Sequence, residues 1–219
     1  SFPTRRSSDL LSAFRKMMPA MSQTEREALE AGTVWWDGEL FSGRPDWKGL
    51  LATPRPTLTP EEQRFLDVDT EELCALSSDW EAATVHRDLP PHVWQFIKDR
   101  GFLGMIIPKE YDGLGLSASC NSAVVTKLTS RSLPLAITVM VPNSLGPAEL
   151  LIHYGTEAQK NRWLPALARG EEIPCFALTE PGAGSDAASI TSHGRVFRDV
   201  DGEIKIELNW RKRYITLAP

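Results

Sequence analysis

The apolar residues of this chain follow a helical period from Thr59 to Gly170 and a strand period after it. Before Gly170, capping boxes at 59–62 and 156–159 each precede an amphipathic run, which is typical of a helix start. After it, residues 203–208 alternate charged and apolar side chains next to the turn pair Asp201-Gly202, the pattern of a β-hairpin. The sequence therefore predicts an α+β chain, an N-terminal all-helical domain followed by the start of a β-sheet or barrel domain.

The helical part is divided by its apolar spacing and its prolines. The spacing predicts one helix over 117–129 and another over 135–151, the second interrupted by Pro142 and Pro147. Closer to the start of the domain, the spacing leaves open a break near 67–70.

Composition divides the chain into four segments. Residues 1–10 look like the in-frame translation of a sequencing-library adapter, so we expect them to be an artefact of the gene model and exclude them from the fold. Residues 11–58 are predicted to be a lead-in arm and Pro-rich linker. Its tryptophans follow no period, so we expect the arm to pack on another segment. Residues 59–172 form the predicted helical domain, and residues 173–219 begin the β domain.

Charge and composition argue against some functions. A net charge of −5 with a pI near 5.5 argues against a nucleic-acid partner, because phosphate binding needs a basic surface. The three cysteines and four histidines are scattered and match no metal or redox spacing. The chain has no uninterrupted apolar window of about 18 residues, so the sequence predicts no membrane span.

Residues 174–186 carry the densest chemical signal of the chain. The apolar run 175–178 predicts a strand, and Thr179 and Glu180 follow it. A further strand is predicted to begin at 214–216. The turn at 181–184 contains two glycines, which let backbone N–H groups approach a ligand because no Cβ is in the way. Such groups beside a hydroxyl suit a phosphate or the polar edge of a ring. The alternative is a tight turn that binds nothing.

This string is one of several stretches that resemble acyl-CoA dehydrogenases. The others are the run 107–115 (Ile-Pro-Lys-Glu-Tyr-Asp-Gly-Leu-Gly), Val-Pro-Asn-Ser-Leu-Gly at 141–146, the stretch 155–171 and Lys-Arg-Tyr-Ile-Thr at 212–216. They occur in the family's order, and the lead-in with two adjacent tryptophans is similar to that of large bacterial long-chain members. The resemblance covers about residues 11–219.

The resemblance implies a fold of three parts: an N-terminal helical domain, a middle β domain and a C-terminal helical bundle, with FAD between the last two. It implies oxidation of an acyl-CoA to a trans-2-enoyl-CoA in fatty-acid β-oxidation. A carboxylate removes the α-proton while the β-hydrogen leaves as hydride to the flavin. The implied partners are the acyl-CoA substrate, an electron-transfer acceptor protein and further copies of the chain in a homo-oligomer.

The resemblance also implies which residues bind the cofactor. Phe176, Leu178 and Thr179 would face the flavin ring, with main-chain N–H groups and the Thr179 hydroxyl on the polar edge of the ring. Gly184 and Ser185 would meet the cofactor pyrophosphate. Ser185 would also border the CoA channel and so contact the substrate.

Two further cofactor residues come from the end of the chain. Tyr214 stands where many relatives have Trp and would pack on the flavin face, and Thr216 would hydrogen-bond near flavin N5. No catalytic residue is expected within this chain, because the family's base is a Glu beyond residue 219. Glu180 is better interpreted as a structural or surface carboxylate. We therefore expect the chain to be a piece of a longer enzyme, inactive and weak in flavin binding by itself.

Two alternatives stay open. Acyl-CoA oxidases and flavin hydroxylases share the helical–β–helical plan, and nothing in residues 1–219 separates them from dehydrogenases. The other alternative is a non-enzymatic helical interaction module with a vestigial β extension. We expect a cytoplasmic location, with membrane association through segments outside this chain as the alternative.

Overall fold

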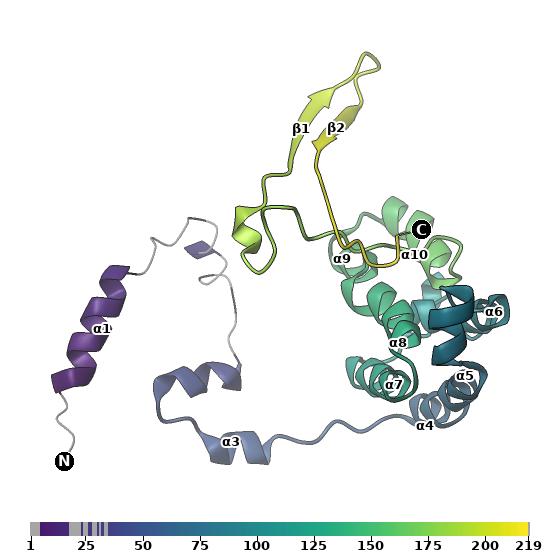
Figure 1. Cartoon of the computed structure of the whole chain (residues 1–219), viewed down its shortest axis with the longest axis horizontal. Coiled ribbons are helices and arrows are strands. Elements are labelled where there is room, and N and C mark those ends of the chain that lie inside the picture. The colour runs from purple at the N-terminus through teal and green to yellow at the C-terminus, as the bar shows by residue number, and fades with distance from the viewer. Residues whose placement is uncertain are drawn as a thin grey trace. The chain divides into compact units, whose positions relative to one another are not determined.

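The computed structural model describes residues 5–17, 23, 26–27, 30, 32 and 35–218. The chain divides into two compact units, Ser1–Arg55 and Pro56–Pro219, and each is described by itself (Figure 1). The first four residues of the segment that we expect to be an artefact lie outside the described residues. The first unit contains α1 (Arg5–Met17), the 3-10 helix η1 (Trp36–Ser42) and α3 (Trp47–Ala52).

The second unit holds the remaining helices and both strands. In chain order they are α4 (Pro60–Arg64), the π-helix η2 (Phe65–Asp69), α5 (Thr70–Leu76), the π-helix η3 (Glu81–His86), α6 (Pro91–Asp99), the 3-10 turns η4 (Phe102–Gly104) and η5 (Lys109–Tyr111), α7 (Ala118–Arg131), α8 (Leu133–Met140), the π-helix η6 (Val141–Leu145), α9 (Ala148–Tyr154), α10 (Glu157–Ala168), the 3-10 turn η7 (Ala187–Ser189), β1 (His193–Arg198) and β2 (Ile204–Asn209).

The aromatic lead-in of the first unit folds locally. The rings of Trp36 and Trp47 lie 4.9 Å apart, and the Trp36 indole N–H donates to the Asp46 carbonyl at 2.7 Å. Asp46 also caps α3 by accepting from the Gly49 N–H at 3.0 Å. No residue of η1 or α3 is buried. These contacts explain the turn between η1 and α3, while the expectation that this arm packs on another segment stays a prediction.

The first capping box of the second unit forms as predicted. The Thr59 hydroxyl accepts from the Glu62 N–H at 3.2 Å, and the Glu62 carboxylate accepts from the Thr59 N–H at 2.8 Å. The same carboxylate also accepts from the Ser117 N–H at 2.7 Å, across to the start of α7. Hydrogen bonds from the side chain of Ser117 and from the backbone of Thr59 and Ser117 hold the pKa of Glu62 down at about 2. One carboxylate thus fixes the starts of two helices.

The break left open near 67–70 is a widened turn instead. The chain passes from α4 through η2 into α5 without leaving the helical region, and the Thr70 hydroxyl donates to the Phe65 carbonyl at 2.9 Å. The Asp69 side chain is buried there against Arg64 at 2.9 Å and Arg100 at 2.8 Å. A π-turn inserts one extra residue, so it re-aims side chains without ending the helix.

The helices α5, α6, α7 and α8 lie together in the second unit (Figure 1), and its core is formed by side chains from these helices and from the turn η4. Its largest fully buried side chains come from all of these elements, and they include Leu73, Val93, Ile97, Phe102, Leu128 and Leu135. A smaller cluster joins α9 and α10 to the loop after η4 through Ile107, Ala148, Leu164, Leu167 and Ala168. The helical half therefore has its own apolar interior, divided into two clusters.

The predicted helix over 135–151 is three elements. Pro142 lies in η6, where the Asn143 side chain donates to the carbonyls of Phe102 at 2.7 Å and Val139 at 2.8 Å and accepts from the Ile106 N–H at 3.2 Å. By length and composition alone, Leu133–Tyr154 is apolar enough to cross a membrane. Because its buried residues form part of the core, we interpret it as a core helix of this unit.

The hairpin confirms the predicted change of period and completes the α+β fold. β1 and β2 pair antiparallel, with Val196 opposite Ile206. The predicted two-residue turn is wrong by one residue. Asp199 N–H donates to the Glu203 carbonyl at 2.9 Å, which leaves three loop residues, and Gly202 adopts φ +79°. A three-residue loop that ends on a left-handed glycine is a common hairpin connection.

Candidate functional site

The segments that hold most of the predicted flavin-binding residues pair with each other. The Phe176 N–H donates to the Thr216 carbonyl at 3.0 Å, and the Thr216 N–H donates back to the Phe176 carbonyl at 3.1 Å. Three residues further along, the Arg213 N–H donates to the Thr179 carbonyl at 3.0 Å. Leu178 and Tyr214 therefore lie between two hydrogen-bonded points on facing segments.

The strands expected at 175–178 and 214–216 are reduced to a single bridge, Phe176 with Thr216. Tyr214 has φ +55° and Leu217 has φ +60°, so both leave the extended region on either side of Thr216. A left-handed residue cannot continue a ladder. The predicted strands are therefore short, while the predicted neighbours are brought together.

Several hydrogen-bond donors next to this bridge have no acceptor among the residues that the structure describes from position 35 on. Among residues 35–218, nothing accepts from the backbone N–H groups of Leu178 and Thr179 or from the Thr179 hydroxyl. Leu178 and Tyr214 are both exposed, Tyr214 at 78%. Unpaired donors on an accessible edge are available to a polar ligand.

Glu180 closes this segment and is engaged on both oxygens. One oxygen accepts from the N–H and hydroxyl of Thr191, at 2.9 and 3.0 Å, and the other accepts from the Ser192 N–H and hydroxyl and from Lys212 Nζ at 2.9 Å. Only 4% of its side chain is exposed. Hydrogen bonds from Ser192, Lys212 and Thr191 hold its pKa far below the usual range. Glu180 is therefore a structural carboxylate, as predicted, and buried rather than on the surface.

The glycine turn follows directly. Glu180 and Ala183 exchange backbone hydrogen bonds at 2.9 and 3.2 Å and so close the turn around Pro181 and Gly182. A Cβ built on Gly182 or Gly184 would meet nothing within 4 Å. Ser185 is exposed, so the predicted residues of the turn face open space on the surface of the second unit. This leaves room for a ligand beside the backbone.

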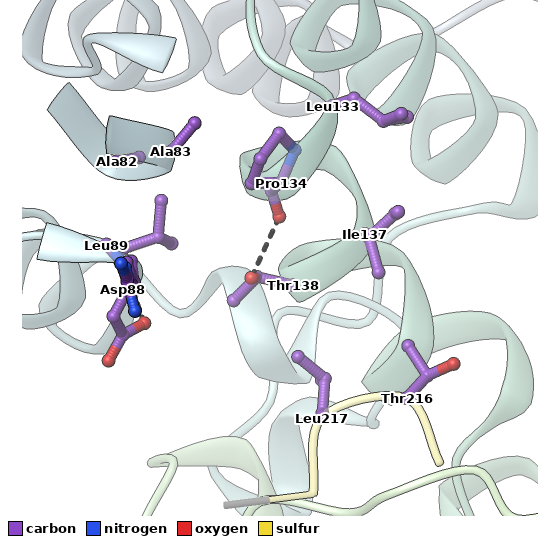
Figure 2. Close-up of a pocket in the computed structure, with 11 residues that line it drawn as sticks. Ala82, Ala83, Asp88, Leu89, Leu133, Pro134, Ile137, Thr138, Thr216 and Leu217 are labelled. Atoms are coloured by element: carbon purple, nitrogen blue, oxygen red, sulfur yellow. Dashed lines mark hydrogen bonds between the residues drawn. The ribbon is translucent and has the colours of Figure 1, made fainter. Parts of the chain in front are cut away.

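A cleft of about 520 Å³ begins at Thr216 (Figure 2). Its walls are the C-terminal stretch, α8 and the region of η3, and the lining residues are Ala82, Ala83, Arg87, Asp88, Leu89, Leu133, Pro134, Ile137, Thr138, Thr216 and Leu217. The volume is in the usual range for small-molecule sites. Thr216 therefore belongs both to the paired segments and to the cleft.

Most of the cleft wall is apolar. The Thr138 hydroxyl donates to the Pro134 carbonyl at 2.9 Å, as Figure 2 shows, so its proton is not available to a ligand. Asp88, the one carboxylate of the lining, accepts from the Leu89 N–H at 2.7 Å and the Trp94 indole N–H at 3.2 Å. An apolar cleft of this kind suits a hydrocarbon group.

Sequence reasoning missed every cleft residue except Thr216. The α8 residues are part of a uniformly apolar helix, and the residues near η3 are ordinary alanines and turn residues. Which face of α8 borders a cavity depends on tertiary packing, so a single sequence carries little signal for it.

A family model described as the N-terminal domain of acyl-CoA dehydrogenases matches residues 60–171, just over half of the chain. The chain belongs to the acyl-CoA dehydrogenase family. The match covers the helical domain from α4 to the residues just after α10. The resemblance drawn from the sequence motifs is therefore confirmed.

Individual relatives agree with this assignment. The chain is 38% identical over 133 residues to a 3-(aryl)acrylate reductase of Clostridium sporogenes, which covers 60% of this chain and 33% of that relative. It is 41% identical over 97 residues to the human mitochondrial very long-chain specific acyl-CoA dehydrogenase, covering 44% of this chain and 15% of the relative. The chain thus spans a third or less of the length of these two relatives.

Among solved structures, an acyl-CoA dehydrogenase complexed with FAD from Bacillus anthracis has a TM-score of 0.59 at 27% identity, covering 72% of this chain and 27% of that one. Acyl-CoA dehydrogenases are FAD flavoenzymes. The donors of this chain fit such a cofactor. The N–H groups of Leu178 and Thr179 have no acceptor within residues 35–218, and the space beside Gly184 is open.

Proposed function

We propose that this chain provides the helical part and the flavin-facing edge of an FAD-dependent dehydrogenase that oxidises acyl-CoA to trans-2-enoyl-CoA in fatty-acid β-oxidation. The observation that carries the proposal is the double position of Thr216. It pairs with the segment that has free donors, and it forms one wall of the apolar cleft. A flavin bound to the free donors and an acyl chain in the cleft would therefore meet at Thr216.

The chain's own residues would bind and orient the reactants. The N–H groups of Leu178 and Thr179 and the Thr179 hydroxyl would hold the polar edge of the flavin, and Tyr214 would cover one of its faces. Gly184 and Ser185 would accommodate the pyrophosphate and the CoA. When bound, FAD supplies the acceptor for the hydride that leaves the β-carbon. The apolar cleft would exclude water from the acyl chain.

The catalytic base is not among the carboxylates next to the bridge or in the cleft wall. Glu180 is buried against Lys212 and two hydroxyls, and hydrogen bonds keep its pKa low, so it is a poor proton acceptor. Asp88 lies on the opposite side of the view from Thr216 in Figure 2, and it already accepts hydrogen bonds from Leu89 and Trp94, so it is not placed to act as the base beside Thr216. We propose that a Glu beyond residue 219 removes the α-proton, and that residues 1–219 alone give no turnover.

The proposal extends to partners and location. The reduced cofactor would pass its electrons to an electron-transfer acceptor protein, and the enzyme would act as a homo-oligomer in the cytoplasm. Acyl-CoA oxidases and flavin hydroxylases share this fold plan and use oxygen instead. Formation of peroxide, compared with reduction of a dye acceptor, separates these alternatives from a dehydrogenase.

The test uses the product of the complete open reading frame that contains this chain. We expect it to be purified with flavin and to reduce a dye in the presence of acyl-CoA. T179A and T216A should lower kcat/KM by at least about tenfold, the typical effect of losing a hydrogen bond to a charged group. S130A changes an exposed hydroxyl on α7 and should have no effect.

Absence of flavin, or flavin without turnover of any acyl-CoA, would exclude the proposed activity. Flavin binding by residues 1–219 with full acyl-CoA turnover would exclude a base outside them.

A further inference from the structure

The end of the cleft that faces η3 contains the two smallest side chains of its lining, Ala82 and Ala83, with Arg87, Asp88 and Leu89 beside them. In Figure 2, Ala82 and Ala83 lie on the opposite side of the view from Thr216 and Leu217, with Thr138 between them. The apolar wall continues along this whole distance through α8. A ligand that reacts beside Thr216 would therefore extend its far end toward the two alanines.

We propose that Ala83 determines the length of the acyl chain that the cleft accepts. The inference rests on the proposed function, because it takes Thr216 as the reactive end. An alanine at this position leaves the far end of the cleft open. A larger side chain would occupy the space of the last methylenes of a long chain, and a short chain would not reach it.

The two alanines differ in how they can be changed. Ala82 is 4% exposed and belongs to the core of the unit, so a larger side chain there would disturb the packing. Ala83 is exposed and lies outside the core cluster. A substitution of Ala83 therefore changes the cleft without requiring the core to move.

The same element offers a matched control. Val85 is also on η3 and is 65% exposed, but it does not line the cleft. A83F and V85F each add a phenyl ring to one turn of the chain. Only A83F puts the ring at the end of the cleft.

The experiment compares the wild-type product of the complete reading frame with A83F and V85F. It measures kcat/KM and the dissociation constant for butanoyl-CoA, octanoyl-CoA and palmitoyl-CoA. Each methylene that loses its place in an apolar pocket costs roughly a factor of four in binding. We therefore expect A83F to lower kcat/KM for palmitoyl-CoA by at least about tenfold and to leave butanoyl-CoA unchanged. V85F should follow the wild type with all three. If A83F lowers the thermal midpoint, A83L gives the same comparison with a smaller side chain.

The outcomes separate the two proposals. A wild-type enzyme that oxidises acyl-CoA while A83F and A83L keep its chain-length profile would overturn the role of Ala83 alone. Equal losses for all three substrates in A83F would also overturn it, because a length effect must be selective. If the wild type neither binds nor oxidises any of the three thioesters, both the proposed function and this inference are wrong.

Discussion

At the scale of single residues, the buried pair of Glu180 and Lys212 should be essential for the order of the bridge region. We expect E180Q to lower the thermal midpoint by several degrees, because it leaves the Lys212 ammonium, with a side chain only 10% exposed, beside a neutral amide. E110Q changes an exposed carboxylate and should have little effect. The double variant E180Q/K212M should recover part of the loss. An unchanged midpoint in E180Q would contradict the structural role of this carboxylate.

Glu62 predicts a pH dependence. Its pKa is lowered from 4.5 to about 2 in the folded chain, so the native state binds fewer protons than the unfolded state in this range. Stability from Glu62 is therefore present above about pH 4.5 and is lost as the pH falls toward 2. In urea unfolding, the gap between wild type and E62Q should be largest near neutral pH and shrink in acid. E61Q, which removes an exposed pair with Lys109, should show little of this gap. A gap independent of pH would contradict the assignment.

At the scale of elements, Asn143 ties the π-turn η6 to the loop after α6. N143A would leave the Ile106 N–H and the Phe102 carbonyl without their partner, at roughly 1–3 kcal/mol for each buried group. We expect the free energy of unfolding to fall by more than about 2 kcal/mol in urea titrations. S144A, at the exposed neighbouring position, should change it by less than about 0.5 kcal/mol. Similar values for the two variants would refute this prediction.

The elements also show which features a sequence reveals. The capping boxes at Thr59 and Thr156 form as predicted, because their signal lies within four consecutive residues. The π-turns were not predicted. The side chains that contact them come from distant positions in the sequence, as Arg100 does for Asp69 in η2. The bridge was predicted as two strands because the left-handed conformation of Tyr214 has no signature in a bulky aromatic residue. The residues proposed to face the flavin were predicted from a local motif, whereas the cleft depends on the placement of α8.

At the scale of the whole molecule, the second unit should fold without the first. Both buried clusters lie within Pro56–Pro219, and the helical core is continuous from α5 to α8. We expect residues 56–219 to keep the helical circular dichroism and cooperative unfolding of the longer chain. The cleavage pattern under limited proteolysis should match in the two forms. A chain of residues 56–219 that is unfolded in buffer would contradict this division.

The bridge between Phe176 and Thr216 closes a loop that contains all the residues between them. The entropic cost of closing such a loop grows only with the logarithm of its length, so doubling the length costs about 0.6 kcal/mol. The tip of the hairpin at Val200 is fully exposed and far in sequence from both ends of this loop. Insertions at the hairpin tip should therefore cost little stability. A shift of one residue at Arg213 or Thr216 would instead remove Thr216 from its shared position in the bridge and the cleft. The loop can thus vary in length at the hairpin tip while its paired ends at Phe176 and Thr216 keep a fixed alignment.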